Sequence, residues 1–380
     1  MQFVSKLPNT GTTIFTVMSG LAVKHGAINL SQGFPNYDPP AALRDLVSHY
    51  MSVGANQYAP MSGVAALRER LAAKIKHLYG HSPNPDTEIT VTSGGTQALF
   101  TAITAFVHAG DEVIIFDPCY DCYQPAIELC GGKAVVCKLT FPDYSVDWAA
   151  VRGLVSARTR MIIFNTPHNP TGRIWRDTDL RALASLTADT AIIVLSDEVY
   201  EHLIFDGQRH QSVLLYPELR LRSLAVYSFG KTFHATGWKT GYVVGSADLM
   251  AEFRKVHQFN VFSVNTPMQL ALADYLAHEE AYLSLPDFYA QKRDYFTEAM
   301  HGSRFKLLPC EGTYFQLADY SGISDEPDTV FARWLTEVHG VAAIPVSAFY
   351  SDHADNKVVR FCFAKTPDLL DRAADKLRLV

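Results

Sequence analysis

Short apolar runs alternate with amphipathic stretches from about residue 63 to about residue 280. Residues 64–79 space their apolar side chains three and four positions apart, and residues 94–108 are entered through glycines, so we expect a helix in each stretch. The apolar runs have the length of strands and cover residues 88–92, 112–116, 134–136, 161–164, 191–195, 224–228 and 242–244. This alternation predicts a mostly parallel sheet that is covered by helices on both faces.

The pattern changes after about residue 280. A long polar helix is expected over residues 288–300, and strand-like segments follow at 314–317 and 358–363. The fold class expected from both patterns is α/β. The predicted domains are a large one, residues 45–280, and a smaller α+β one, built from residues 1–44 and 281–380.

Composition and charge exclude several classes of protein. Hydrophobic residues make up 48% of the 380 positions and charged residues 19%, which is enough apolar surface for a large core. The net charge of −6, from 33 basic and 39 acidic residues, argues against nucleic-acid binding, which needs a basic face. No apolar run approaches the roughly 20 residues of a membrane-spanning helix, and the amino-terminal residues lack a secretion signal. We therefore expect a cytoplasmic protein.

The cysteines suggest no metal site. Cys119 and Cys122 form a C-x-x-C pair, and a zinc site would need a second pair at similar spacing. The remaining cysteines do not supply one; they are Cys130, Cys137, Cys310 and Cys362. Small buried thiols are the simpler interpretation.

Polar segments follow three of the apolar runs directly. They are Ser93-Gly94-Gly95-Thr96, Asn165-Thr166-Pro167-His168-Asn169-Pro170-Thr171-Gly172 and Ser196-Asp197-Glu198-Val199-Tyr200. In parallel sheets, ligands bind beyond the carboxyl ends of the strands, so these side chains are candidates for one site. The glycines of the first segment suit a phosphate at a helix amino terminus. Each segment taken alone is equally compatible with an ordinary turn.

A fourth segment, Phe229-Gly230-Lys231-Thr232, looks like the end of a Walker A loop. That motif requires a glycine five positions before Gly230, and the chain has Ala225 there. The following residues also lack helical periodicity, so a nucleotide triphosphatase is excluded. By its position alone, Lys231 could equally be a solvated surface lysine.

Together these segments resemble the class I/II aminotransferases, which are pyridoxal-phosphate (PLP) enzymes of fold type I. NTPHNPTG, SDEVY and SFGKTFHATGWKTGY occur in the order and spacing of that family. SQGFPNY, NQYAPMSG, FDPCYDCY and PCEGTYF are most similar to its methionine and kynurenine/glutamine aminotransferase branch. The resemblance covers nearly the whole chain. It implies a seven-stranded, mostly parallel sheet between helices, with a smaller α+β domain beside it.

The resemblance implies roles for four residues around the ring of PLP. Lys231 matches the lysine that binds the cofactor covalently and then, once the substrate has displaced it, transfers the α-proton. Asp197 matches the carboxylate that keeps the pyridine nitrogen protonated. Asn169 and Tyr200 match the pair that contacts the 3-oxygen of the ring. The catalytic residues implied are therefore Lys231, Asp197 and Tyr200.

Other matches concern the cofactor phosphate and the faces of the ring. The residues matched to the phosphate site are Gly95, Thr96, Ser228 and Lys239, the last being arginine in many family members. Lysine keeps the charge there but loses the bidentate fork. Tyr120 falls where an aromatic ring stacks on the cofactor. Tyr58 matches a tyrosine that reaches the phosphate of a neighbouring subunit, which implies a homodimer.

The substrate carboxylate is assigned by the same resemblance. Arg360 matches the arginine that grips it bidentately, and Gly33 and Asn169 assist. The Asn169-Pro170 bond resembles a cis peptide of the family. Four further titratable residues are expected to be structural rather than catalytic; they are Glu201, His202, His168 and His257.

The family resemblance implies ping-pong transfer of an amino group from an L-amino acid to a 2-oxo acid. A PLP-dependent cysteine-conjugate or cystathionine β-lyase is the alternative, because it uses the same lysine, acid and arginine. A transcription regulator is excluded, because no basic helix-turn-helix pattern precedes SQGFPNY.

The substrate side chain is expected to be apolar. Aspartate-specific relatives bring a second arginine from the partner subunit, and the corresponding segment here, HQFNVFSVNTP, contains none. Phe259 and Phe262 of this segment, with Tyr37 and Tyr120, are expected to form apolar walls. A dicarboxylate would bury an unpaired charge there, so we predict methionine, with phenylalanine, tyrosine, kynurenine or glutamine as weaker substrates.

Overall fold

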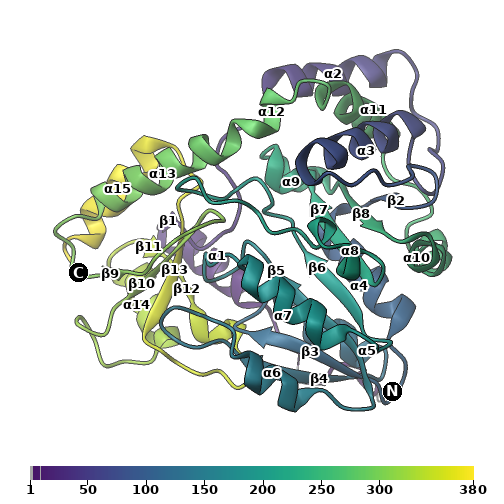
Figure 1. The fold of residues 1–380 in the computed structure, drawn as a ribbon. Coiled ribbons are helices and arrows are strands. Elements are labelled where there is room, and N and C mark those ends of the chain that lie inside the picture. Colours follow the sequence, from purple (N-terminus) through teal and green to yellow (C-terminus); the bar gives the residue numbers. More distant parts are fainter. Residues whose placement is uncertain (1–2, 9) are drawn as a thin grey trace.

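The computed structural model describes residues 3–8 and 10–380, and a seven-stranded sheet lies at its centre (Figure 1). Along the sheet the strands are β2 (Ile89–Thr92), β8 (Gly241–Gly245), β7 (Ser223–Ser228), β6 (Ile193–Asp197), β5 (Thr159–Asn165), β3 (Glu112–Asp117) and β4 (Lys133–Lys138). β8 runs antiparallel to both of its neighbours, and all the other pairs are parallel. The predicted α/β fold with a mostly parallel seven-stranded sheet is confirmed.

Both faces of the central strands of this sheet are buried, which explains the nearly continuous apolar runs of β3, β5, β6 and β7. In β5, Met161 and Ile163 belong to one hydrophobic cluster, whereas Ile162 and Phe164 belong to the other. The first cluster is closed by α4 (Gly94–Phe106), α5 (Tyr123–Leu129) and α10 (Ala247–Asn260). The second is closed by α3 (Ala65–Tyr79), α6 (Trp148–Leu154), α7 (Asp177–Thr187), α8 (Pro217–Arg220) and α11 (Thr266–Tyr275).

The strand predicted at residues 191–195 lies two residues further along the chain, and this shift places Asp197 within the sheet. The apolar run at 191–195 predicts a strand two residues too early, because β6 spans Ile193–Asp197. Ser196 and Asp197 are polar, yet they pair in register with Phe164 and Asn165 of β5. Hydrogen bonding along the ladder therefore carries β6 beyond its apolar run and fixes the backbone of Asp197 within the sheet.

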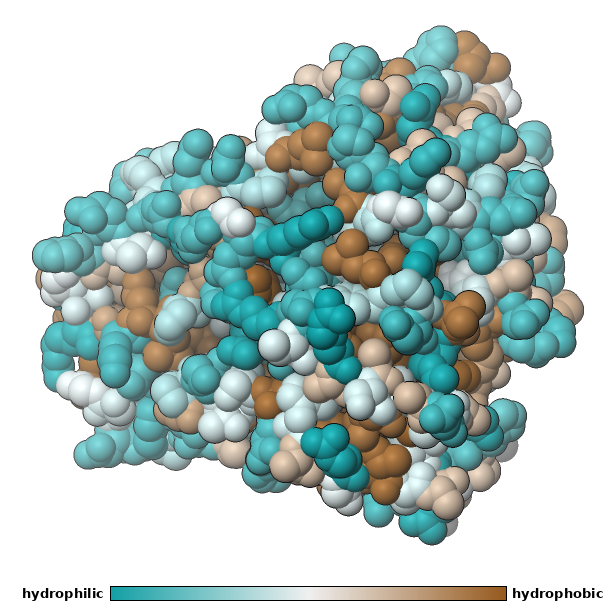
Figure 2. Space-filling view, viewed as in Figure 1, coloured by the Kyte–Doolittle hydropathy of each residue, from teal (hydrophilic) through white to brown (hydrophobic). Residues whose placement is uncertain are grey.

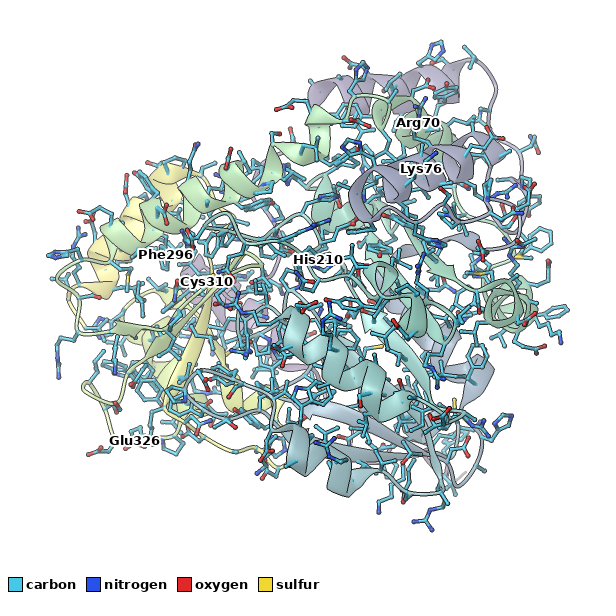
Figure 3. All side chains as sticks on the ribbon, in the orientation of Figure 1. Arg70, Lys76, His210, Phe296, Cys310 and Glu326 are labelled. Carbon is cyan, nitrogen blue, oxygen red and sulfur yellow. The ribbon has the colours of Figure 1, made fainter. Side chains whose placement is uncertain are left out.

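A second, smaller sheet lies beside the first, on the left of Figure 1. It is antiparallel, with the strands β12 (Ile344–Pro345), β13 (Val358–Cys362), β10 (Phe315–Asp319) and β9 (Lys306–Leu307) in that order. The long helix predicted at 288–300 is α13 (Leu285–Ala299), and its Phe296, labelled in Figure 3, packs against Phe361 of β13. The other helices in this part are α1 (Ile14–His25), α14 (Asp328–Val338) and α15 (Pro367–Leu377).

The amino-terminal segment joins the carboxyl-terminal part of the chain. β1 (Ile28–Asn29) pairs in parallel with β11 (Val341–Ala342), and α1 packs on α14. The remaining α-helices among the described residues are α2 (Ala41–Ser52), which packs on α11, and the one-turn helices α9 (Phe229–Thr232) and α12 (Glu280–Leu283). The division into domains at residues 44/45 and 280/281 stays a prediction.

The outer face seen in Figure 2 is mainly hydrophilic, and its apolar patches are small and separate. Within residues 3–8 and 10–380, no helix is both long and apolar enough to cross a membrane. The polar features that matter lie inside, where β2, β5, β6 and β7 end.

Candidate active site

A cavity of about 260 Å³ lies where these strands end, and β13 and the loop around Gly33 close it from the other side. The catalytic, cofactor-binding and carboxylate-binding residues expected from the sequence line it except Tyr58, whereas three aromatic residues expected beside the substrate side chain, Tyr37, Phe259 and Phe262, do not. The lining residues expected in advance are Gly33, Gly95, Thr96, Tyr120, Asn169, Asp197, Tyr200, Ser228, Lys231, Lys239 and Arg360. Residues as distant in sequence as Gly33 and Arg360 thus share one wall.

The end of the cavity next to the amino terminus of α4 is suited to bind an anion. α4 begins at Gly94, immediately after β2, so the backbone N–H groups of its first turn are unpaired within the helix. Gly95 must be glycine, because a Cβ there would lie 2.9 Å from Cγ1 of Val199. Ser228 at the end of β7 and Lys239 line the same end, and together these groups offer N–H, hydroxyl and ammonium donors.

Asp197 lies on the floor of the cavity at the end of β6. Its Oδ2 accepts a hydrogen bond from the Tyr123 hydroxyl at 2.7 Å, and its Oδ1 accepts one from the backbone N–H of Val199 at 3.4 Å. Burial raises the pKa of Asp197 to about 6, against hydrogen bonds that lower it. A cation in the cavity would stabilise this carboxylate.

Lys231 reaches the cavity from α9, just after β7. Its Nζ lies 3.0 Å from the Tyr314 hydroxyl and 3.5 Å from the carbonyl oxygen of Gly33. It is also 5.5 Å from the centre of the Tyr200 ring. Burial lowers the pKa of Lys231 to about 8, and the positive charges of Arg360 and Lys239 act in the same direction. A buried amine with this pKa is partly neutral at physiological pH, as a base must be.

Arg360 extends from β13 and is fully buried. Its Nη1 donates to Oδ1 of Asn169 at 2.7 Å, and its Nη2 donates to the carbonyl oxygen of Ser31 at 3.2 Å. Its Nε has no hydrogen-bond partner in the part of the chain that the structure describes. The guanidinium lies 3.8 Å from the centre of the Phe315 ring, and burial lowers its pKa to about 10. A buried cation with an open donor suits a carboxylate.

The turn after β5 is held by hydrogen bonds to its neighbours. Oδ1 of Asn165 accepts a bond from the backbone N–H of Asn169 at 2.7 Å, and Nδ2 of Asn165 donates to the carbonyl oxygen of Asp197 at 2.7 Å. The Asn169-Pro170 peptide bond is cis, as the resemblance implies. The turn and the end of β6 are therefore fixed relative to each other.

Tyr58, expected at the phosphate of a neighbouring subunit, and three aromatic residues expected near the substrate do not line the cavity of their own chain. Tyr58 is 81% exposed, and its ring packs edge-on against Phe262, which is itself 52% exposed. Phe259 is 91% exposed, so neither phenylalanine forms a wall of the cavity in its own chain. The expectation for Tyr37 is wrong, because its hydroxyl donates to Tyr289 and its ring packs on Phe288 of α13.

The titratable residues expected to be structural do not line the cavity among the described residues. His168 bonds Thr171 through Nδ1 at 2.7 Å, and burial lowers its pKa to about 3. His257 is fully buried beside Gln97 of α4. Glu201 and His202 lie against each other beneath the end of β6.

Sequence reasoning missed several residues of the site. Tyr123 holds Asp197, and Tyr314 contacts Lys231. Phe15, Gln32 and Phe315 line the cavity. Two signals were present: Tyr123 follows Tyr120 by three positions, close to one helical turn, and Tyr314 and Phe315 lie in PCEGTYF, one of the segments that carries the resemblance.

Comparisons with known proteins agree with this geometry. Residues 25–377 match the model of the family aminotransferase class I and II. The methionine aminotransferase of Escherichia coli K12 is 56% identical over 375 residues, which cover 98% of this chain and 97% of that protein. Human kynurenine–oxoglutarate transaminase 1 is 34% identical, with 94% of this chain and 93% of that protein covered.

A solved structure is equally similar. The crystal structure of YbdL from Escherichia coli, whose reactivity identified a methionine aminotransferase function, has a TM-score of 0.98 and 55% identity, and both chains are covered completely. Identity at this level over whole chains leaves one conclusion. The chain belongs to the class I and II aminotransferases, enzymes that use pyridoxal phosphate.

Proposed function

We propose that this protein moves the amino group of an L-amino acid with an apolar or aromatic side chain, methionine above all, to a 2-oxo acid. The convergence of Lys231, Asp197 and Arg360 on one cavity carries the proposal. These are an amine that is partly neutral, a carboxylate without a cation and a cation without an anion. Such a set suits a cationic heterocycle and an α-amino acid bound side by side.

The residues of the cavity fit pyridoxal phosphate. Asp197 holds the pyridine nitrogen in its protonated form, because a buried carboxylate with a raised pKa gains most from a cationic partner. The first turn of α4 with Gly95 and Thr96, together with Ser228 and Lys239, would hold the phosphate. Tyr120, whose hydroxyl lies 3.0 Å from Oγ1 of Thr96, stacks on the ring. When bound, the cofactor withdraws electrons from the substrate Cα.

The chain's own groups then bind the substrate and move its proton. Arg360 binds the α-carboxylate through the guanidinium edge whose Nε is open, helped by Gly33 and Asn169. Asn169 and Tyr200 line the cavity and would hold the 3-oxygen of the ring. Lys231 takes up the α-proton at Nζ and returns it in the next step, for which a pKa near 8 is well matched.

The residues of the cavity that have no role so far favour an apolar substrate side chain. Among the residues that the structure describes, the cations lining the cavity are Lys231, Lys239 and Arg360, and each already has a role. Phe15 and Phe315 add aromatic surface to the wall beside Arg360. A second carboxylate would be buried here without a partner, whereas a thioether gains about 25 cal/mol for each Å² buried.

The substrate proposal is tested with methionine and aspartate as competing amino donors to one 2-oxo acid. We expect kcat/KM for methionine to exceed that for aspartate by at least roughly tenfold, the ratio given by about 1.4 kcal/mol. Product analysis belongs to the same experiment. An aspartate efficiency equal to that of methionine overturns the apolar site. Ammonia, pyruvate and a free thiol from a cysteine conjugate, in place of the 2-oxo acid that keeps the C–S bond, indicate the β-lyase.

We also propose a homodimer with shared sites. Tyr58, Phe259 and Phe262 are exposed aromatic residues. In a dimer that buries them, Tyr58 of one subunit would lie at the phosphate of the other subunit's site. Mixing Tyr58→Phe subunits with Arg360→Ala subunits should give hybrids with one intact site and one doubly altered site. Active monomers, or the absence of this complementation, contradict the proposal. The cytoplasmic location stays a prediction, to be tested by cell fractionation.

A further inference from the structure

Tyr314 is a buried tyrosine behind Lys231, outside the lining of the cavity, and the roles above leave it unused. It precedes β10 and is 0% exposed. Its hydroxyl contacts two groups that take part in the proposed reaction, Nζ of Lys231 at 3.0 Å and the carbonyl oxygen of Gly33 at 2.6 Å. Each of these three residues comes from a different part of the chain.

The direction of these hydrogen bonds is fixed by chemistry. The Gly33 carbonyl oxygen can only accept, so the single proton of the Tyr314 hydroxyl is donated to it. The tyrosine oxygen then has only lone pairs to offer to Lys231, whose Nζ must be the donor. A second acceptor for the same nitrogen, the Gly33 oxygen itself, lies 3.5 Å away.

The packing around Tyr314 leaves its ring little freedom. The rings of Tyr200 and Phe315 lie at centroid distances of 5.3 and 4.8 Å, and the ring of Tyr289 lies at 5.9 Å. Its carbonyl oxygen accepts a hydrogen bond from the backbone N–H of Phe363 at 3.0 Å, which links it to the end of β13. The hydroxyl is therefore held at a fixed point beside Nζ of Lys231.

We propose that Tyr314 is a positioning residue for proton transfer by Lys231. The Tyr314 oxygen accepts one N–H of the released amine and the Gly33 carbonyl accepts the other, so the nitrogen lone pair is left facing the cavity. On that lone pair Lys231 takes up the α-proton of the substrate and becomes an ammonium, and it becomes neutral again when it returns the same proton. This role rests on the proposed function, because it assumes that Lys231 is the base.

The test compares Tyr314→Phe with Tyr289→Phe. Both changes remove one hydroxyl from the same aromatic cluster, but the Tyr289 hydroxyl bonds Nδ1 of His234 and not Lys231. For the amino acid that the wild type uses best, we expect Tyr314→Phe to lower kcat at least about tenfold, with KM within roughly twofold. The kinetic isotope effect with the α-deuterated substrate should rise, because proton transfer becomes slower relative to the other steps. Tyr289→Phe should match the wild type in all three quantities.

A second measurement reads Lys231 without turnover. In enzyme loaded with pyridoxamine phosphate the lysine is free, and the pH dependence of its acylation, followed on the Lys231 peptide by mass spectrometry, gives its pKa. Losing the tyrosine acceptor disfavours the ammonium, so the midpoint should fall by roughly half a unit or more in Tyr314→Phe and stay unchanged in Tyr289→Phe.

The outcomes separate the two proposals. Equal kcat, isotope effect and acylation midpoint in the two variants, or equal losses accompanied by equal losses of thermal stability, overturn the positioning role of Tyr314. A wild type that forms no 2-oxo acid from any amino acid overturns the proposed function instead. The acylation midpoints then still decide whether Tyr314 holds the Lys231 amine.

Discussion

Two lysines of this protein, Lys74, which is buried, and Lys231, which is partly buried, have opposite surroundings. The side chain of Lys74, on α3, is 4% exposed, forms an ion pair with Glu201 and donates to the Tyr242 hydroxyl at 3.0 Å. Glu201 accepts a further bond from Tyr79 at 2.6 Å. Lys231 contacts a hydroxyl and a carbonyl oxygen, and within the described ranges no carboxylate lies at hydrogen-bonding distance from it. The charge of Lys74 is therefore paired with a carboxylate. The amine of Lys231 has no such partner and can take part in a reaction.

Two adjacent acids repeat this contrast. Glu198 accepts bonds from Ser196, Tyr227 and His210, the last labelled in Figure 3, at 2.8, 3.0 and 2.9 Å. The carboxylate of Asp197, one position earlier, faces the cavity. It accepts hydrogen bonds only from Tyr123 and the backbone N–H of Val199 among the described residues, and burial raises its pKa. The paired charges beneath the site contribute to the fold. The unpaired charges in the cavity can bind ligands, and they lower the stability of the ligand-free protein.

The largest expected effect separates the two lysines by activity. Lys231→Ala should lower kcat by roughly ten-thousandfold or more, because the base and the covalent attachment are both lost. Borohydride treatment of the wild type should leave the cofactor on the Lys231 peptide. Label on Lys239, or a Lys231→Ala protein that still turns over, would show that the base has been misassigned.

The second effect separates the lysines by stability. Lys74→Met leaves Glu201 buried without its cation, which should lower the free energy of unfolding by about 3–5 kcal/mol. The measurement is chemical denaturation of the cofactor-free protein.

A double variant is the control for this change. Lys74→Met with Glu201→Gln removes both charges, so most of the lost stability should return. If Lys74→Met is as stable as the wild type, the ion pair contributes nothing to the fold, and the contrast with Lys231 fails.

The third expected effect is an increase in stability. Asp197 has a pKa of about 6 against an ordinary value of 3.8, so its burial lowers the stability of the cofactor-free protein as the pH rises from about 4 to 6. Asp197→Asn removes this penalty and should raise the free energy of unfolding at pH 8 by about 2–3 kcal/mol, with no gain below about pH 4. Denaturation curves at the two pH values check the prediction, and turnover should be largely lost.

Glu198→Gln is the matched control, one position away. Its carboxylate meets only donors, including the backbone N–H of Val213 at 3.0 Å, so an amide N–H₂ there faces another donor. This variant should lose stability at pH 8, where Asp197→Asn gains it. A gain in both variants, or a loss in both, would remove the distinction between the two acids.

Much of the fold and of the site could be predicted from the sequence, for local reasons. Strands buried on both faces are mainly apolar, so each run of the large sheet was visible, and helix α3 showed its apolar spacing. Lys231, Asp197, Asn169 and Arg360 were assigned through the resemblance of short segments to one family, and without that resemblance Arg360 would not have been singled out. The end of β6 was displaced, because its last two residues are polar and are held by pairing with β5 rather than by hydrophobicity.

The tertiary structure alone decided which side chains face one another. Lys74 meets Glu201 across 127 positions, Lys231 meets Tyr314 across 83, and Asp197 meets Tyr123 across 74. Such contacts depend on strand register and helix packing, which periodicity in one segment does not encode. For the same reason Tyr37, predicted to reach the substrate, packs on α13 instead. The sequence by itself determined the elements and the chemical groups, and the packing between distant segments determined which buried charges are paired and which are left to react.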